Sequence, residues 1–492
     1  MAMPQPVGAL PVPADPRRWR ALVVCLVAGF MALLDVTIVN VALPSMRTGL
    51  GARGADLQWI VSGYALAFGV ILGVAGRFGD ARGRRTAFLA GVTMFVLASV
   101  ASGLAPAAGM LIATRVVQGL AGGVITPQIS GLIQQLFRGA ERGRAFGLFG
   151  AVVGLSTAVG PTLGGLLIAL GGPMHGWRWI FFVNVPIGAV ALLLGARWLP
   201  GQPSGTGGQR LDVFGMLLLG TGVLLLLLPL IEQQQWHGRS RWLLTAAGAV
   251  VLAGFWRWER HYARTGEPVV DFSLFQRRSY ASGCLLGLLY FGGFSAVFFV
   301  LSLFLQLGLG YSALATGLAL TPFAVGSAIA AAVGGRLVSR LGRPLVAAGL
   351  LLVALGVGGA LLAVTLVSDH TLGWALAAPL LVAGSGSGLV ITPNVTLTLS
   401  EVPVPRASSA GGVLQTAQRV GAASGVAVVG AVLFAQAAAG DWPTAVRSAL
   451  TVTIGLVLAA LVVAAVDIGS GRRPGRDPAT TNRRPGRDPA TR

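Results

Sequence analysis

The chain contains two similar segments, which read Gly-Arg-Phe-Gly-Asp-Ala-Arg-Gly-Arg-Arg at Gly76–Arg85 and Gly-Arg-Leu-Val-Ser-Arg-Leu-Gly-Arg at Gly335–Arg343. Each lies between apolar runs long enough to cross a bilayer. The first lies between the second and third of these runs, and the second between the tenth and eleventh. This spacing predicts a duplicated six-helix unit with two further helices inserted between the copies, and duplicated halves are a transporter architecture.

The composition places most of the chain in lipid. Of 492 residues, 54% are hydrophobic and only 11% are charged, whereas soluble domains carry about 25% charged residues. The mean hydropathy is +0.76. The net charge of +20 comes entirely from arginine. We attribute it to coding bias, and we expect a lipid bilayer and no nucleic acid as partner.

Runs of about 20 apolar residues can cross a bilayer as helices. The sequence predicts an all-α polytopic membrane protein with about fourteen spans. They are 21–43, 57–78, 86–105, 109–133, 144–170, 179–199, 212–231, 242–258, 280–306, 314–338, 344–367, 372–399, 407–436 and 445–466. The eighth is the shortest of them, and it ends in Trp-Arg-Trp-Glu.

Arginine is concentrated in alternate loops, and such loops face the cytoplasm. We therefore expect a multi-pass protein of the cytoplasmic membrane with both termini inside. The expected units are an N-terminal segment (1–20), a six-helix bundle (21–199), a linker with two inserted helices (200–278), a second six-helix bundle (279–467) and a tail (468–492). The tail repeats Arg-Arg-Pro-Gly-Arg-Asp-Pro-Ala-Thr, which predicts disorder, with a contact to anionic lipid as the alternative to no role.

Ionisable residues inside a span are costly, so each is a functional hypothesis. Asp35 lies in the first span, Arg115 in the fourth and Arg419 in the thirteenth. Asp35 and Arg115 lie roughly 12 Å and 9 Å from the outer ends of their predicted helices, and could therefore pair. We interpret Asp35 as a proton carrier and Arg115 as its partner; a fixed ion pair that only joins two helices is the alternative. Arg419 could reach the membrane surface, or bind Gln415 one turn back.

Five motifs make the chain resemble the major facilitator superfamily, and within it the fourteen-helix drug:proton antiporters. The loop at Gly76–Arg85 is similar to the signature loop of the superfamily, with Phe78 in place of Leu and Arg82 one place late. The others are Leu34–Pro44 in the first span, Arg115–Gly123 in the fourth, Gly160–Gly165 in the fifth and Gly411–Gly425 in the thirteenth. Together they cover most of the chain.

The resemblance implies two bundles that alternate access, and it implies roles for particular residues. Asp35 would be the proton-linked carboxylate and Arg115 its partner. Residues of the signature loop would form a cytoplasmic lock that opens during transport, whereas the second loop has Ser339 in place of the acid and would form a weaker lock. Residues of the fifth-span motif would shape the helix that closes the outward side, although static packing also explains its glycines. The gating residues are Gly76, Asp80, Gly83, Arg84, Gly160, Pro161, Gly164 and Gly165.

We expect export of a small amphipathic drug or antibiotic in exchange for protons, with a dedicated exporter of an endogenous metabolite or self-made antibiotic as the alternative. The substrate should be neutral or monovalent, because the C-terminal spans contain no central Asp or Glu. Candidate substrate-binding residues are Asn40, Tyr64, Gln118, Phe291, Gln306, Asn394, Gln415 and Arg419.

Other classes of function have little support in the sequence. An enzyme is not expected, because the chain has four His and two Cys, and shows no metal-ligand spacing, nucleophile elbow or phosphate-binding loop. No loop is long enough for the partner domain of a sensor. We expect a monomer with no metal and no cofactor, driven by the proton gradient.

Overall fold

The computed structural model describes residues 16–201, 212–231, 240–367, 371–437 and 441–471. All regular structure in these residues is helical, which confirms the all-α prediction. Twelve helices are long and apolar enough to cross a membrane, or thirteen if a bent pair within one long helix is counted. Helix α8 lies outside that set and accounts for the remaining predicted span.

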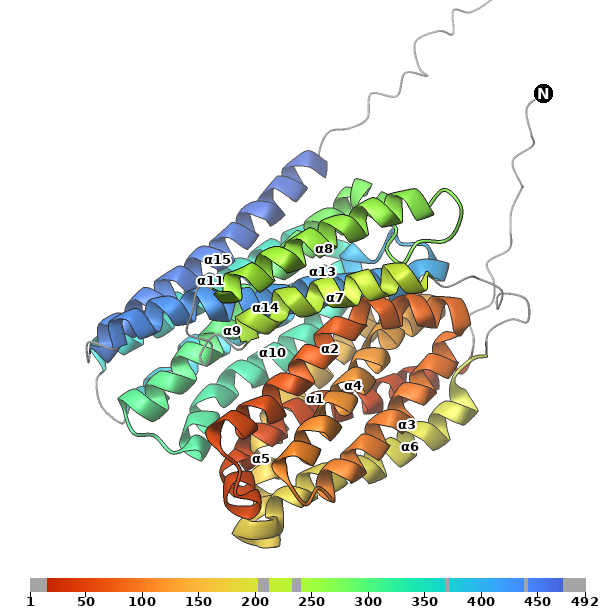
Figure 1. The fold of residues 1–492 in the computed structure, drawn as a ribbon. Coiled ribbons are helices and arrows are strands. Elements are labelled where there is room, and N and C mark those ends of the chain that lie inside the picture. The colour runs from red at the N-terminus through yellow and green to blue at the C-terminus, as the bar shows by residue number, and fades with distance from the viewer. Residues whose placement is uncertain (1–15, 202–211, 232–239, 368–370, 438–440, 472–492) are drawn as a thin grey trace, which may run out of the picture.

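The N-terminal half is a bundle of six helices (Figure 1). They are α1 (Arg18–Leu50), α2 (Gly54–Arg82), α3 (Arg84–Gly103), α4 (Ala108–Leu136), α5 (Gly139–Phe182) and α6 (Asn184–Trp198). Gly83 joins α2 to α3 in a single residue with φ of 111°. Only glycine adopts this conformation readily, which explains the glycine at this place in the repeated segment.

The C-terminal half repeats this plan, and Gly342, with φ of 57°, joins its second and third spans. Its helices are α9 (Arg278–Leu303), a π-helical turn η2 (Phe304–Gly308), α10 (Ala313–Leu341), α11 (Arg343–Leu366), α12 (Leu372–Ala375), α13 (Ala377–Thr398), η3 (Val404–Arg406), α14 (Ala407–Ala437) and α15 (Trp442–Gly471).

Two inserted helices, α7 (Val213–Ile231) and α8 (Ser240–Tyr262), form a hairpin on the outside of the bundle. A short helix, η1 (Phe272–Gln276), precedes α9. Leu219 and Leu227 of α7 lie against α2, where a β-carbon added to Gly73 or Gly69 would come within 2.8 or 2.9 Å of them. The same apolar cluster includes Val413 of α14. The hairpin therefore covers the junction of α2 and α14.

Several predicted boundaries were wrong. Helix α1 continues beyond residue 43, with Pro44 inside it, to Leu50, because the Pro lies in a helix already held by its neighbours. The fifth and sixth spans are nearly continuous: α5 runs to Phe182 with a break at Gly172, where φ is 77°. Helix α15 continues into the predicted tail as far as Gly471, and residues 472–492 lie outside the described residues.

The two halves meet along two seams at one end of the bundle. We call it the arginine-rich end, defined by the helix junctions at Gly83, Phe137–Arg138 and Gly342. In the first seam, α2 lies on α14, and a β-carbon on Gly76 would come 2.4 Å from the Ser408 carbonyl oxygen. In the second, α5 lies on α10, and a β-carbon on Gly335 would come 2.6 Å from the Gly147 Cα. Glycine allows this backbone approach, so the structure is closed at the arginine-rich end.

Candidate functional site

A buried polar network surrounds Asp35 in the N-terminal half. Arg115 Nη1 lies 2.5 Å from Asp35 Oδ2. Gln118 Nε2 and Asn184 Nδ2 each donate to Asp35 Oδ1 at 2.9 Å. The side chains come from α1, α4 and α6, and Asp35 is 0% and Arg115 1% exposed. The ion pair considered from the sequence for Asp35 and Arg115 is therefore present.

Ser99 of α3 closes the network from the other side. Its hydroxyl accepts from Gln118 at 3.2 Å and from Asn184 at 3.0 Å, and it donates to the Phe181 carbonyl at 2.9 Å. Asn184 Oδ1 is buried without a hydrogen-bond partner among the described residues. Hydrogen bonds to ionised groups are about twice as strong as neutral ones, so the protonation of Asp35 would change the whole network.

Glycines bring the helices close enough to build this network. A β-carbon on Gly119 of α4 would lie 2.4 Å from the Tyr64 carbonyl oxygen in α2. On α5, a β-carbon on Gly160 would lie 2.0 Å from the Thr37 hydroxyl, and one on Gly164 would lie 2.9 Å from Ile38. A larger residue at Gly119 would push α4 away from α2, and one at Gly160 would push α5 away from α1.

For two other residues of the fifth-span motif, the structure describes no close side-chain contact. A β-carbon on Gly165 would meet no atom within 4 Å, so close packing does not explain this glycine. The side chain of Pro161 lies outside the described set, although its backbone is helical.

Aromatic rings extend the network toward the C-terminal half. The Arg115 guanidinium lies 4.2 Å from the centroid of the Tyr64 ring, and Tyr64 stacks on Phe68 with a centroid separation of 6.0 Å. The Arg419 guanidinium lies 4.5 Å from the centroid of the Phe68 ring. Tyr64 and Phe68 therefore connect an arginine of one half to an arginine of the other.

The structure brings together only some of the predicted substrate-binding residues. Tyr64 and Gln118 join the Asp35 network, and Arg419 lies close to it. Asn40 is exposed and donates to the Val36 carbonyl at 3.1 Å, a contact within its own helix. Phe291 belongs to an aromatic cluster of the C-terminal half.

The remaining three predicted residues lie apart from one another. Gln306 is exposed and donates to Ser302 on its own helix. Asn394 accepts from Arg343 at 2.7 Å, at the arginine-rich end. Gln415 donates to Ser130 of α4 at 3.3 Å, and not to Arg419. The predicted pairing of Arg419 with Gln415 is therefore absent, because the two side chains have different partners.

A second buried charged cluster joins the halves at the arginine-rich end. Arg84 Nη2 lies 2.8 Å from Asp80 Oδ1. Asp80 also accepts from the Ser408 and Ser409 amides, at 3.2 and 2.8 Å, and from the Ser409 hydroxyl at 2.7 Å. Arg84 donates to the Ser408 hydroxyl at 2.9 Å and to the Val404 carbonyl. A carboxylate at the N-terminus of α14 is favoured by the helix dipole.

The corresponding residues of the second copy stay within their own half. Ser339 is exposed, and its hydroxyl donates to the Arg336 carbonyl at 3.5 Å. Arg343 lies 2.7 Å from Asp467 of α15 and donates to Asn394 and to the Ser279 carbonyl, each at 2.7 Å. Among the residues that the structure describes, the second loop therefore makes no charged bond across the seam that corresponds to the Asp80 contacts.

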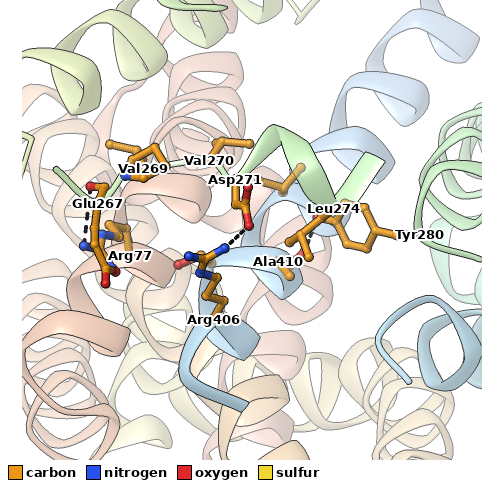
Figure 2. Close-up of a pocket in the computed structure, with 12 residues that line it drawn as sticks. Arg77, Glu267, Val269, Val270, Asp271, Leu274, Tyr280, Arg406 and Ala410 are labelled. Atoms are coloured by element: carbon orange, nitrogen blue, oxygen red, sulfur yellow. Dashed lines mark hydrogen bonds and ion pairs between the residues drawn. The ribbon is translucent and has the colours of Figure 1, made fainter. Parts of the chain in front are cut away.

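The segment between α8 and α9 also touches both halves (Figure 2). Glu267 lies 3.3 Å from Arg77 of α2. Four residues later, Asp271 pairs with Arg406, just before α14. Both ion pairs line one small pocket. The segment therefore bridges the α2–α14 seam at its arginine-rich end.

Sequence reasoning missed two members of the Asp35 network. Asn184 lies in the apolar run Ile-Phe-Phe-Val-Asn-Val-Pro, and a lone amide in such a run could have been recognised as a buried polar group. Ser99 gave no comparable signal, because serine is common in membrane helices. Within the described ranges, no three His, Cys, Asp or Glu side chains are grouped to hold a metal ion.

Comparison with known proteins places this geometry in a family. The Major Facilitator Superfamily profile matches residues 25–426. The chain is 39% identical over 426 residues to the probable actinorhodin transporter of Streptomyces coelicolor, covering 86% of this chain and 73% of that protein. It is 34% identical over 492 residues to the tetracenomycin C resistance and export protein of Streptomyces glaucescens, covering 97% and 88%.

Further similarities point the same way. The multidrug resistance protein Stp of Mycobacterium tuberculosis is 35% identical over 410 residues, covering 82% of this chain and 74% of Stp. Among solved structures, the human organic anion transporter MFSD10 has a TM-score of 0.64 at 17% identity, covering 92% of this chain and 100% of that one. The proton:xylose symporter XylE has the same TM-score and identity, covering 90% and 94%. At this identity the structures support the fold alone.

Proposed function

We propose that this chain, which belongs to the Major Facilitator Superfamily, exports small amphipathic compounds across the cytoplasmic membrane in exchange for protons. It is a membrane transporter related to antibiotic resistance and export proteins, and not an enzyme. The observation that supports proton exchange is the buried Asp35 network. Asp35 is the ionisable carboxylate there, and its only cationic partner among the described residues is Arg115.

The proposed coupling step is the protonation of Asp35. The ionised carboxylate accepts from Arg115, Gln118 and Asn184, and so ties α1 to α4 and α6. A proton on Asp35 removes its charge, and the bonds from its donors weaken. The change reaches α5, because Thr37 donates to the Ser156 carbonyl at 3.2 Å, half a turn from Asp35. Gly160 and Gly164 leave α5 free to shift against α1.

The orientation follows from the arginine distribution. We place the arginine-rich end in the cytoplasm, as the positive-inside rule requires. The structure then corresponds to a state closed toward the cytoplasm. For the opposite state, Asp80 must leave the N-terminus of α14, and the Glu267 and Asp271 ion pairs must break or move with the halves.

The proposed exporter has two candidate substrate ranges, a single antibiotic or several classes of drug. The names of two relatives, the probable actinorhodin transporter and the tetracenomycin C resistance and export protein, favour a dedicated exporter of one antibiotic. The similarity to Stp favours a multidrug transporter. A growth-inhibition panel in a pump-deficient host separates them: protection against one structural class indicates the former, and protection against several indicates the latter.

The coupling proposal is tested with Asp35→Asn in proteoliposomes. We expect the variant to bind substrate but to lose most pH-driven uptake, by about tenfold or more, because general proton transfer steps contribute such factors. Asp441→Asn is the matched control, since Asp441 is exposed and caps α15 by accepting from the Thr444 amide, as Asn also can. Undiminished pH-driven transport by Asp35→Asn would contradict the proposal.

A further inference from the structure

The interior of the membrane-spanning region carries an unbalanced positive charge. Asp35 and Arg115 form an ion pair at 2.5 Å, so their charges cancel. Arg419 lies about twelve residues from the start of α14, a depth of roughly 18 Å. No acidic side chain pairs with it among the described residues. With Asp35 ionised, this region therefore has a net charge of one positive unit.

The guanidinium of Arg419 contacts an aromatic ring, and its N–H groups are available to bind a further acceptor. Its described contact is with the face of Phe68, at 4.5 Å. A guanidinium carries five N–H donors in a planar fork, and none of those of Arg419 donates to a described residue. Arg419 is half-buried, and a cation at this depth in a membrane-spanning helix needs acceptors or counter-charge. The arrangement is therefore incomplete without a further group.

The position of Arg419 suits a substrate. It lies on α14, in the C-terminal half, whereas Phe68, Tyr64 and Arg115 belong to the N-terminal half. A molecule bound against both Arg419 and Phe68 would thus contact both halves. It would also lie two rings from the Asp35 network, because Phe68 stacks on Tyr64 and Tyr64 contacts Arg115.

From these contacts we propose that Arg419 and Phe68 form a recognition site for an aromatic substrate that carries a single oxyanion, either a carboxylate or a phenolate. The guanidinium fork binds the oxyanion, for which arginine is well suited. Phe68 contacts the aromatic part of the substrate. A cationic drug would be disfavoured by like charge. This inference rests on the proposed export function, and narrows the neutral or monovalent class expected from the sequence to monovalent anions.

The test uses three fluorescent probes of one shape and different charge: anthracene-2-carboxylate, 2-(hydroxymethyl)anthracene and the cation of 2-(aminomethyl)anthracene. Binding to the purified full-length protein is measured by fluorescence titration. We expect the wild type to bind the carboxylate about tenfold or more tightly than the ammonium probe, since one charged hydrogen-bonded contact is worth about 1.5–3 kcal/mol.

Variants of Arg419 and Phe68 test whether these two residues cause the preference for the carboxylate probe. Arg419→Gln should lose about tenfold in affinity for the carboxylate and keep its affinity for the alcohol. Arg419→Glu should reverse the preference, and Phe68→Leu should weaken all three probes. Arg336→Gln is the control, because it removes an equal charge from an exposed position. If Arg419→Gln does not fold, Arg419→Lys, which keeps the charge without the fork, should show a partial loss.

Three results would overturn the inference. They are equal or tighter binding of the ammonium probe by the wild type, no binding of the carboxylate by folded wild-type protein, and an unchanged carboxylate affinity in Arg419→Gln. Asp35→Asn separates this inference from the proposed function. It should keep the order of probe affinities and lose pH-driven uptake of the carboxylate, so failure of coupling and failure of recognition give different results.

Discussion

The two seams that close the arginine-rich end are built from different chemistry. In the α2–α14 seam, Asp80 and Arg84 make directional bonds to the first residues of α14 and to the segment before it. In the α5–α10 seam, Gly147 and Gly335 bring two backbones into contact. The first seam combines close packing at Gly76 with a buried charged cluster, and the second depends on close packing.

The difference shows that duplication did not preserve the contacts. The acid of the first loop is Asp80, and the corresponding residue of the second is the exposed Ser339. Without that acid, Arg343 pairs with Asp467 inside its own half. Opening the first seam requires Asp80 and Arg84 to give up their hydrogen bonds to neutral groups of Val404, Ser408 and Ser409, whereas the second seam can loosen by small shifts of packed backbones. The two seams should therefore respond differently to substitution.

The largest effect is expected from Asp80→Asn in the ionic seam. Removing one partner of a buried charge pair costs about 3–5 kcal/mol, here because Arg84 would lose its counter-charge. We expect a lower thermal unfolding temperature, and at least about a tenfold loss of export because the variant also weakens the Asp80 hydrogen bonds to Ser408 and Ser409, which hold the closed state together. Transport in proteoliposomes and thermal unfolding measure both.

Ser339→Ala is the matched control for Asp80→Asn. It removes the side chain at the corresponding position of the second loop, and we expect export to stay within about twofold, as for other exposed positions. Similar losses in both variants would refute the contrast between the seams.

An intermediate effect is expected from Gly335→Ala in the packed seam. The added methyl group would lie 2.6 Å from the Gly147 Cα and 2.4 Å from the Gly143 carbonyl oxygen, so α5 and α10 must move apart. Overpacking costs about 1–3 kcal/mol. The loss should not depend on salt, because no charge is involved. Gly358→Ala is the control, since its methyl group would meet no atom within 4 Å; equal destabilisation by both would argue against the packing explanation.

A smaller effect concerns the hairpin that covers the ionic seam. Glu259 lies near the arginine-rich end of α8, beyond the predicted span 242–258, and accepts from the Val270 amide at 3.3 Å. Burial raises the pKa of Glu259 from 4.5 to about 7, opposed by that hydrogen bond and aided by the nearby Asp212. Its folded pKa lies above its unfolded pKa, so the stability it contributes is complete below pH 4.5 and is lost as the pH rises through about 7.

We therefore expect the wild type to lose about 1 kcal/mol of stability as the pH rises from 4.5 through about 7. The Glu259→Gln variant should lose less. Thermal unfolding from pH 4.5 to 8 measures it, with the exposed Glu401→Gln as control. A wild-type curve that rises with pH, or one that Glu259→Gln leaves unchanged, would show that Glu259 does not titrate as proposed.

The smallest effect is expected from Ser339→Asp, which returns an acid to the second loop. The introduced carboxylate would lie near the N-terminus of α5, where the helix dipole favours negative charge by about 0.3–1 kcal/mol. We expect slightly higher stability and slower export. Ser339→Asn keeps the size without the charge, and an equal change in both variants would exclude an electrostatic cause.

The sequence predicted the pair of Asp35 and Arg115 well, because a charged side chain inside a membrane helix is costly unless it pairs or faces a polar interior. Asp35 and Arg115 could be placed at similar depth by counting residues along two helices. The repeated segments also align Gly83 with Gly342, although the sequence did not predict that these glycines join helices. Their positive φ values give the physical cause.

Other features depend on packing between distant segments, which local patterns do not contain. The partners of Asn184 and Ser99 depend on how α3 and α6 rotate around their axes. The contact of Arg419 with Phe68 depends on the approach of the two halves. The continuation of α1 past Pro44 was missed because proline in a sequence favours a helix end, whereas here Gly49 packs against the Met174 carbonyl and neighbouring chain supports the last turns.

The inserted hairpin affects the route by which an apolar compound in the bilayer reaches the space between the two halves. Helix α7 shields the α2–α14 seam from the surrounding bilayer with Leu219, Val223 and Leu227. In the described part of the chain, neither α7 nor α8 packs on the α5–α10 seam in this way. A compound that approaches from the bilayer would thus meet α7 at the α2–α14 seam, and would have to enter at the other seam. Lateral entry from the bilayer would then be limited to the α5–α10 seam, and bulky residues along α5 and α10 would control it.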